Sequence, residues 1–478
     1  MDSPNVGRTA AIYDALRELE CGEFLNDLKK LVSVRTVSTL ENMYPALENY
    51  VDEVLPGLLE PIGFKTRSFE NPVSGGGPLL FAERIEEPDA LTVLFYGHGD
   101  VVLGMDERWE TPAGPWDIHI EGDKWYGRGT ADNKGQHLVA LSAIRSVIRR
   151  RGSLGFNIKL LVETSEEIGS PGLREFCMEN KDLLQADVLL GSDGPRLDKD
   201  HPTLFMGSRG ILTFDLVVRC RERLKHSGNW GGLLKDPVIR LSNAISTIAD
   251  ENGRMLVHDW KADSLTASVK EALANDAIVR VFESAEIDAE WGESELSPAE
   301  RVFASNSFMV LGISSGSTTN PVNAIQTQAS AVCQLRFVVG TDPQKALTQL
   351  REHLDKCGFN DVEIIPRDET YHSATRLSPD HPWVKFVTGS IVDTLNVEPI
   401  LLPNLGGSLP NDSFSEILGL PTIWIPHSYP DCQQHSPDEH ILETIVNQGL
   451  QIMTGLFWDI GAKSYVELRH MGGSNAKC

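Results

Sequence analysis

The sequence predicts an α/β fold in which a mostly parallel sheet is flanked by helices. The first observation is three apolar runs, at 91–97, 156–162 and 186–191, that have the length and composition of buried strands. The second is the helical spacing of apolar residues over 133–150, between the first two runs. The third is that all three runs lead into histidine or acidic residues, as expected where parallel strands meet at one ligand-binding edge of a sheet.

Further elements of the same domain precede and follow these strands. Helical spacing predicts helices over 9–32 and 42–60, and a strand is expected at 79–84 after a turn rich in Gly and Pro. Pro171 is expected at the first position of the next helix, a position that proline favours. The α/β pattern returns after residue 377, with helices predicted at 381–395 and 440–458 and strands at 399–402 and 422–426.

A change of pattern after residue 206 predicts a second, inserted α+β domain. Its elements follow the order βαββαβ, which suggests one sheet covered by helices on one face. Residues 251–307 exceed the usual length of a connection and are expected to form a partly helical insertion. The first domain is therefore expected at 1–206 and 378–478, and the inserted domain at 207–377. The strands of the inserted domain are predicted at 211–220, 308–313, 329–339 and 362–365, and its helices at 237–249 and 343–356.

Composition limits the class of protein. A chain of 478 residues is long enough for two hydrophobic cores. The 43 Lys and Arg against 68 Asp and Glu leave a formal charge of −25, which disfavours nucleic acid or an anionic membrane as a partner. No signal-like segment begins the sequence and no apolar run approaches the ~20 residues of a membrane span, so we expect a cytoplasmic protein. The seven cysteines are scattered without a Cys-x-x-Cys pair, which argues against a disulfide framework and a zinc-thiolate site.

Five side chains near the strand ends and in one distant loop are candidate metal ligands. Histidine and carboxylates bind zinc and similar cations, and two ions ~3.5–4 Å apart need one carboxylate to bridge them. Singly, each residue has an ordinary explanation: His98 as a structural histidine, Asp132 as a helix cap, Asp193 as a turn residue. The adjacent acids Glu166 and Glu167, however, are unfavourable unless a cation or a proton compensates their charges. The joint pattern indicates a metal site with the candidate ligands His98, Asp132, Glu167, Asp193 and His435.

Six motifs, in order along nearly the whole chain, carry a family resemblance. The sequence resembles the two-metal metallopeptidases that include carnosinase, aminoacylase-1 and carboxypeptidase G, and is most similar to the carnosinase-like dipeptidase branch. The resemblance implies a zinc-peptidase-like catalytic domain and an inserted domain for dimerisation that also serves as a lid. The motifs are Gly97-His98-Gly-Asp100, Trp125-Tyr-Gly-Arg-Gly-Thr-Ala-Asp132-Asn-Lys-Gly135, Glu166-Glu167-Ile-Gly-Ser170, Ser192-Asp193-Gly194, His226-Ser-Gly228 and His435-Ser-Pro-Asp-Glu439.

The resemblance also implies how two divalent metal ions are held. One carboxylate bridges the ions, and one histidine and one acid complete the site of each. Nitrogen and oxygen ligands without thiolate suit zinc, and manganese or cobalt fit the same ligands. Carried over by position, the bridging residue is Asp132, His98 and Asp193 complete one site, and Glu167 and His435 complete the other.

Two further residues beside the ligands have roles implied by the resemblance. Glu166 would be the general base, which takes a proton from a metal-bridged water and later passes one to the leaving amine. Asp100 would orient the His98 imidazole and raise its basicity. A structural hydrogen bond made by Asp100 is compatible with that role.

The inserted domain supplies candidates by the same resemblance. His226 lies in a Gly-rich loop and would reach the site of a partner subunit to stabilise the oxyanion, which implies a homodimer; a solvent-exposed loop histidine is the alternative. Arg336 would clamp a substrate carboxylate, or else form a surface ion pair. Asn323, Gly407 and Ser408 fall where the family contacts substrate, although a simple turn would use the same residues.

The function implied is that of a cytoplasmic two-metal hydrolase of peptide or amide bonds. Its substrates would be small and bear a free carboxylate, as for a dipeptidase or a carboxypeptidase. The alternative is an N-acyl-amino-acid amidohydrolase of the aminoacylase type, or a hydrolase of amino-acid conjugates. A noncatalytic metal-binding scaffold is the rival from another class, and Glu166 argues against it because a binding protein has no physical need of a base. The expected partners are a small peptide or N-acyl amino acid and a second copy of the chain.

Overall fold

A computed structural model describes residues 4–367 and 372–462 of the chain. The chain divides into two compact units, each described here by itself. Unit 1 comprises Met1–Gly207, Leu377–Leu402 and Pro410–Cys478. Unit 2 comprises Ser208–Arg376 and Pro403–Leu409. None of the helices in the described residues is long and apolar enough to cross a membrane.

Unit 1 is built on an eight-stranded sheet in the order β1-β2-β6-β3-β7-β16-β8-β15. The neighbours β6–β3, β3–β7, β7–β16 and β8–β15 run parallel, whereas β1 and β2 join antiparallel at one edge. The predicted α/β fold with a mostly parallel sheet is therefore confirmed. The strands are β1 Lys65–Phe69, β2 Leu79–Arg84, β3 Thr92–His98, β6 Asn157–Glu163, β7 Val188–Gly191, β8 Thr203–Phe205, β15 Ile400–Leu402 and β16 Thr422–Trp424.

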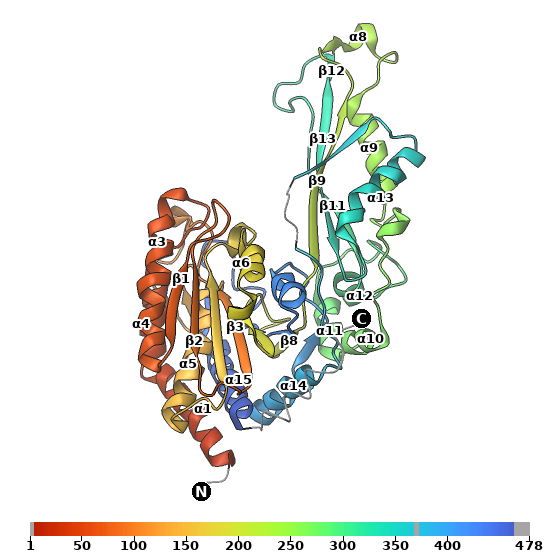
Figure 1. Ribbon diagram of the computed structural model, residues 1–478. Coiled ribbons are helices and arrows are strands. Elements are labelled where there is room, and N and C mark those ends of the chain that lie inside the picture. The colour runs from red at the N-terminus through yellow and green to blue at the C-terminus, as the bar shows by residue number, and fades with distance from the viewer. Residues whose placement is uncertain (1–3, 368–371, 463–478) are drawn as a thin grey trace. The chain divides into compact units, whose positions relative to one another are not determined.

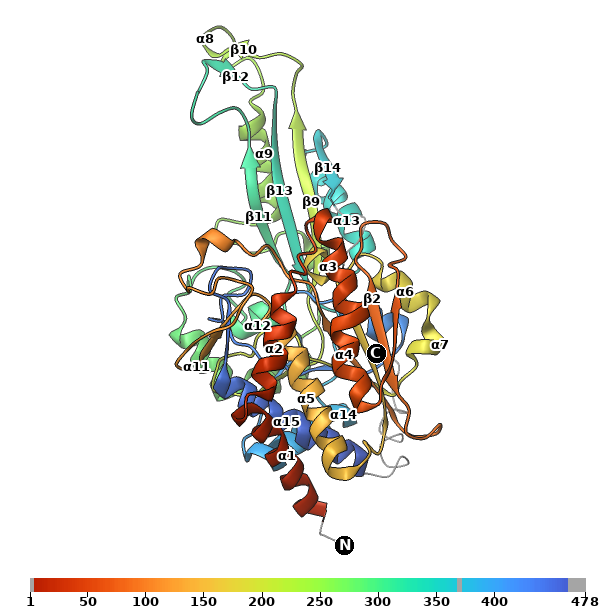
Figure 2. The same ribbon diagram turned by 90° about the vertical axis from the view of Figure 1, so that its left-hand side faces the viewer.

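Helices lie on both faces of this sheet. Helices α1, α2, α4 and α5 lie on the face turned towards the viewer in Figure 2. On the other face α6 packs against β1, where the rings of Phe176 and Phe69 lie 5.1 Å apart. The helices of unit 1 are α1 Pro4–Glu20, α2 Glu23–Ser33, α3 Tyr44–Asn49, α4 Leu55–Leu59, α5 Lys134–Arg151, α6 Leu173–Glu179, α7 Lys181–Leu184, α14 Pro382–Leu395 and α15 Glu443–Ala462.

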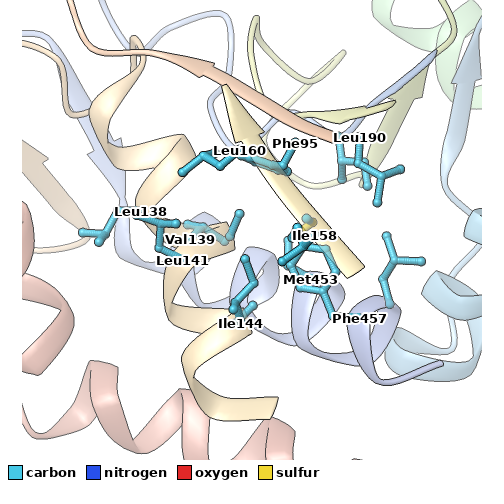
Figure 3. Packing of buried hydrophobic residues seen from close by; sticks show 14 of the residues in the cluster. Phe95, Leu138, Val139, Leu141, Ile144, Ile158, Leu160, Leu190, Met453 and Phe457 are labelled. Atoms are coloured by element: carbon cyan, nitrogen blue, oxygen red, sulfur yellow. The ribbon is translucent and has the colours of Figure 1, made fainter. Parts of the chain in front are cut away.

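The core of unit 1 lies between the sheet and helices α5 and α15. Figure 3 shows Leu138 and Ile144 of α5, Ile158 and Leu160 of β6, and Met453 of α15 within one buried cluster. All five side chains have at most 2% of their surface exposed. Because α5 is packed so firmly, the loop before it is held at a fixed place beside the sheet.

Several predicted helix boundaries were wrong, for local reasons. The helix expected over 9–32 is interrupted at Gly22, whose backbone has a left-handed φ of 81°. The helix expected over 42–60 contains a π-helical turn, Tyr50–Val54, just before Pro56, which cannot donate a backbone hydrogen bond. Pro171 does not begin α6, because Gly172, with φ 82°, occupies the N-cap position and the helix starts at Leu173.

Unit 2 contains a four-stranded antiparallel sheet in the order β11-β13-β9-β14. Helices α9 and α13 cover one face, where Leu241 and Leu350 pack with Phe214 and Leu335 of the strands. The order β9-α9-β11-β13-α13-β14 agrees with the predicted βαββαβ pattern, and residues 251–307 contain three short α-helices and the 3-10 helix His258–Trp260. The elements are β9 Gly210–Arg219, α9 Pro237–Ile248, α10 Ala267–Leu273, α11 Asp276–Ser284, α12 Pro298–Phe303, β11 Ser307–Ser314, β13 Gln328–Phe337, α13 Pro343–Lys356 and β14 Val362–Pro366.

A small hairpin-like arm extends beyond one end of β9 and β13 (Figures 1 and 2). It consists of β10, Lys225–His226, paired antiparallel with β12, Ala324–Ile325, and of the short helix α8, Ser227–Trp230. The two segments of the arm lie far apart in sequence. The pairing of β10 with β12 therefore brings two sequence-predicted residues, His226 and Asn323, to the same end of unit 2.

Candidate metal centre

The predicted convergence of strand ends occurs in unit 1. Strands β6, β3 and β7 are neighbours and run parallel, with His98 at the end of β3 opposite Glu163 at the end of β6. The chain then continues from β6 into Glu166 and Glu167, and from β7 into Asp193. The three loops leave the same edge of the sheet, which is where the sequence predicted them.

All five predicted ligands meet at this edge, in two groups that share one residue. His98, Asp132 and Asp193 form the first group, and Asp132, Glu167 and His435 form the second. Within each group the candidate ligand atoms all lie within 4.8 Å of one another.

Asp132 belongs to both groups through its two different oxygens. Its Oδ1 lies 2.9 Å from Nε2 of His98, and its Oδ2 lies 3.2 Å from Nε2 of His435. The alternative reading of Asp132 as a helix cap is excluded, because Asn133 occupies the N-cap position of α5. The side chain of Asn133 instead donates to the carbonyl of Ser192 at 2.7 Å, which ties the Asp132 loop to the Asp193 loop.

The charges of the site need compensation. Hydrogen bonds to Asp132 and Glu167 raise the pKa of His435 to about 11, and burial raises the pKa of both Glu167 and Asp193. Oδ2 of Asp193 is buried and accepts no hydrogen bond in the part of the chain that the structure describes. An orphaned carboxylate oxygen beside imidazole and carboxylate donors fits a divalent cation such as zinc, which takes this ligand chemistry.

Glu166 lies among the ligands without belonging to either group. Its Oε2 is 4.0 Å from Nε2 of His98. Burial raises the pKa of Glu166 well above its ordinary value, and the charges of Asp193 and Glu167 act in the same direction. A carboxylate in such surroundings accepts a proton more readily than one in water.

Asp100 contacts more of the site than the sequence indicated. Its Oδ1 lies 3.3 Å from Nδ1 of His98, as expected for a residue that orients the imidazole. Its two oxygens also accept from the backbone N–H groups of Glu166 and Glu167, both at 3.1 Å. Asp100 therefore holds the turn that carries both glutamates as well as the histidine.

Sequence reasoning gave no role to two residues that contact the ligand loops. Gln434 donates to Oδ2 of Asp132 at 3.2 Å. Gln136 donates to the carbonyl of Ala131 at 2.8 Å and accepts from the backbone of His427 at 2.7 Å. The position of Gln434 directly before the predicted ligand His435 could have indicated a role at the site. Nothing in the sequence distinguishes Gln136, because it lies within a regular helix.

The predicted residues of the inserted domain fall in two places in unit 2. At the arm, His226 is exposed, and the N–H of Ser227 donates to the carbonyl of Asn323 at 2.9 Å. Away from the arm, Nη1 of Arg336 donates to Oγ of Ser408 at 2.9 Å, beside Gly407. No described carboxylate forms an ion pair with Arg336, and its role as a carboxylate clamp stays a prediction.

A family model, peptidase family M20/M25/M40, matches residues 94–459. The chain belongs to this family. The resemblance predicted from the six motifs is thereby confirmed. The predicted class is confirmed with it: the chain is a metallopeptidase, an enzyme that hydrolyses peptide bonds.

Individual known proteins are similar to the chain over different lengths. The Beta-Ala-His dipeptidase of Mus musculus is 36% identical over 183 residues, which are 38% of this chain and 37% of that enzyme. The cysteinylglycine-S-conjugate dipeptidase of Corynebacterium striatum is 28% identical over 340 residues, 68% of this chain and 71% of that enzyme. The solved M20 family metallo-carboxypeptidase Sso-CP2 from Sulfolobus solfataricus is 26% identical with a TM-score of 0.77, and the match covers 92% of this chain and 100% of that one.

Proposed function

We propose that the chain is a two-metal dipeptidase or carboxypeptidase that cleaves small peptides with a free C-terminal carboxylate. The observation that carries the proposal is the placement of Asp132, with one oxygen facing His98 and the other facing His435. Similarity to two enzymes named dipeptidases and one named a metallo-carboxypeptidase supports the substrate class.

The proposed chemistry assigns the metal sites to unit 1. His98, Asp132 and Asp193 would hold one ion, and Asp132, Glu167 and His435 the other. We propose zinc, while manganese or cobalt would suit the same nitrogen and oxygen ligands. When bound, such ions polarise a carbonyl oxygen and lower the pKa of water.

The protein's own groups carry the protons. Glu166 is the general base: its carboxylate accepts a proton from the attacking water and then donates one to the leaving amine. The raised pKa of Glu166, caused by its burial, favours the acceptance of a proton from water. Asp100 holds His98 and the backbone N–H of Glu166 through Oδ1, and the backbone N–H of Glu167 through Oδ2.

Unit 2 would recognise the substrate. Arg336, whose guanidinium lacks a carboxylate partner among the described residues, would clamp the C-terminal carboxylate with Ser408 and Gly407 beside it. His226 would stabilise the oxyanion in the site of a partner subunit, with Asn323 at its side. His226 is exposed and its Nδ1 accepts from the backbone N–H of Gly228 at 3.2 Å, so Nε2 is the nitrogen that would make such a contact.

A homodimer follows from that role of His226, and we propose that unit 2 is the dimerisation and lid domain while unit 1 is catalytic. Strand β11 supports the dimer, because it is an edge strand whose Met309, Val310, Leu311 and Ile313 are exposed. Exposed apolar edges of this kind usually pair or are covered. A cytoplasmic location stays a prediction from the sequence.

The test compares substrates and two neighbouring glutamates. The metal-loaded protein is expected to hydrolyse free dipeptides; activity confined to N-acyl amino acids would instead favour the aminoacylase-type alternative. Glu166→Gln should lower turnover by ~10²–10⁴-fold while two ions per chain remain bound. Its matched control, Glu167→Gln, should lose bound metal. Undiminished turnover in the Glu166 variant would falsify the proposed mechanism. If the wild-type protein hydrolysed neither dipeptides nor N-acyl amino acids, the result would favour a noncatalytic metal-binding scaffold.

A further inference from the structure

Glu439 is a buried carboxylate that neither metal group includes. It is 1% exposed, and it pairs with Arg128, which is equally buried, through an Nη1–Oε2 contact of 2.7 Å. Its Oε1 accepts from the backbone N–H of Asp132 at 2.9 Å and of Ala131 at 3.0 Å. The N–H of Gly129 lies 3.0 Å from Oε2 and 3.1 Å from Oε1.

The Glu439 carboxylate thus accepts hydrogen bonds from three backbone N–H groups and one guanidinium, all in a single five-residue loop, Arg128–Asp132. A buried carboxylate is unfavourable unless it is paired and hydrogen-bonded, and these donors supply both kinds of contact to Glu439. The loop gains a defined shape in return. Gly129 has a φ of 85° within it, a conformation that the converging N–H groups require and that glycine adopts without strain.

Glu439 itself belongs to the loop that carries His435. Immediately after it, β17, His440–Leu442, pairs antiparallel with β5, Lys124–Tyr126. The N–H of Gly127 donates to the backbone carbonyl of Glu439 at 2.9 Å. The segment that delivers Asp132 and the segment that delivers His435 therefore run side by side, joined by backbone at one end and by the Glu439 side chain at the other.

The His435 loop is in need of such support. His435 has a φ of 59°, and Gln433 and Asp438 lie in the same left-handed region, which is unfavourable for residues other than glycine. Surrounding contacts must maintain this backbone. Besides the side-chain contacts of Gln434 and His435 with Asp132, the Glu439 carboxylate links this loop to the backbone N–H of Asp132.

We propose that Glu439 is a positioning residue of the metal centre, which fixes the separation between Asp132 and His435 and so assembles the group Asp132, Glu167 and His435. The inference rests on the proposed two-metal function. It concerns ion binding by one group of ligands, so it is tested by metal affinity rather than by turnover alone. The other group, with His98 and Asp193, takes no ligand from the His435 loop.

The first experiment replaces Glu439 by Gln, which keeps the size of the side chain but removes its charge and one acceptor. Metal is removed and Zn²⁺ is titrated back with calorimetry and elemental analysis. One ion should bind as in wild type, and the affinity for the second should fall by ~10–100-fold, as for other groups that orient ligands. Turnover should fall at limiting Zn²⁺ and recover at high Zn²⁺, a rescue that a merely structural defect would not give.

The matched control is Glu18→Gln in the same unit. Glu18 is also buried, at 2% exposure, and is paired with Arg145 and Arg149, both at 2.7 Å. Both substitutions should lower the unfolding temperature, but the Glu18 variant should bind two ions with wild-type affinity. If Glu439→Gln does not fold, Glu439→Asp keeps the charge with a shorter reach and should weaken the second ion by a smaller factor.

Two results would overturn the inference in distinguishable ways. Wild-type affinity for both ions in a folded Glu439 variant would exclude the positioning role while leaving the two-metal function intact. A wild-type protein that binds fewer than two ions would remove the two-metal function and the inference with it.

Discussion

At the scale of single residues, Asp132 decides how charge is distributed in the centre. Each of its oxygens faces an imidazole, and the pKa of Asp132 is lowered by hydrogen bonds to His435 and His98 despite its burial. Without a cation, the imidazolium protons balance the acids around them. A cation takes the place of those protons, because imidazole must be neutral to act as a ligand. Metal binding and protonation therefore compete at the same atoms.

Arg336 is the residue whose change should alter substrate binding most selectively. Arg336→Lys keeps the charge but loses the planar fork, and a charge-assisted hydrogen bond of ~1.5–3 kcal/mol corresponds to about a 10–100-fold rise in KM for a dipeptide. The C-terminal amide of that dipeptide should be affected much less. Steady-state kinetics on both substrates give the comparison. Arg219→Lys, an exposed arginine paired with Glu363 in the same unit, is the control and should behave as wild type.

The convergence of four of the candidate ligands and Glu166 could be predicted from the sequence, because these residues lie at strand ends or just before a helix. His435 lies in a distant loop and was assigned to the same site by the family motifs alone. The residues that hold these ligands could not be predicted. Glu439 reaches the N–H of Asp132 across 307 residues of sequence, and its role depends on a strand pairing that no local pattern reveals. Gln136 faces the ligand loops only because α5 is packed in one particular orientation. These contacts depend on tertiary structure alone.

At the scale of elements, long and strongly patterned segments were the predictable ones. The bounds predicted for the helix at 343–356 agree with α13, and the four long strands of unit 2 were placed within two residues. The three-residue strands β4 His119–Glu121, β5 and β17 were missed, because three residues are too few to show alternation. Residues 440–442 were expected to be helical for that reason, although they form β17.

The exposed edge strand β11 is the proposed dimer interface. Leu311→Lys places a charge on an exposed, unpaired edge, and edge lysines prevent strand pairing between molecules. The wild-type protein is expected to be a dimer and this variant a monomer, as measured by light scattering coupled to size-exclusion chromatography. Ile365→Lys, on the opposite edge strand β14, is the matched control and should leave the dimer intact. Dimers of equal stability in both variants would exclude β11 as the interface.

At the scale of the whole molecule, bound metal should contribute to stability. Ligands that bind only the folded state stabilise it by ~2.7 kcal/mol at one hundred times their dissociation constant. Removing metal with a chelator should therefore lower the unfolding temperature by several degrees, and Zn²⁺ should restore it, as measured by calorimetry. Asp132→Asn, which removes the shared ligand, should show little response to either treatment. Equal unfolding temperatures for the metal-free and metal-loaded wild type would contradict the proposed centre.

The pairing of β17 with β5 also bears on how the protein is made. The ribosome releases His98, Asp132, Glu167 and Asp193 early, and the whole of unit 2 must be synthesised before His435 and Glu439 emerge. Until then the nascent chain contains the acidic residues of the site without His435 and without Glu439. A fragment that stops before residue 435 retains three of the four acid and histidine partners around Asp132 but lacks His435 and Glu439, so we expect the group of Asp132, Glu167 and His435 to form only once this late loop has been synthesised.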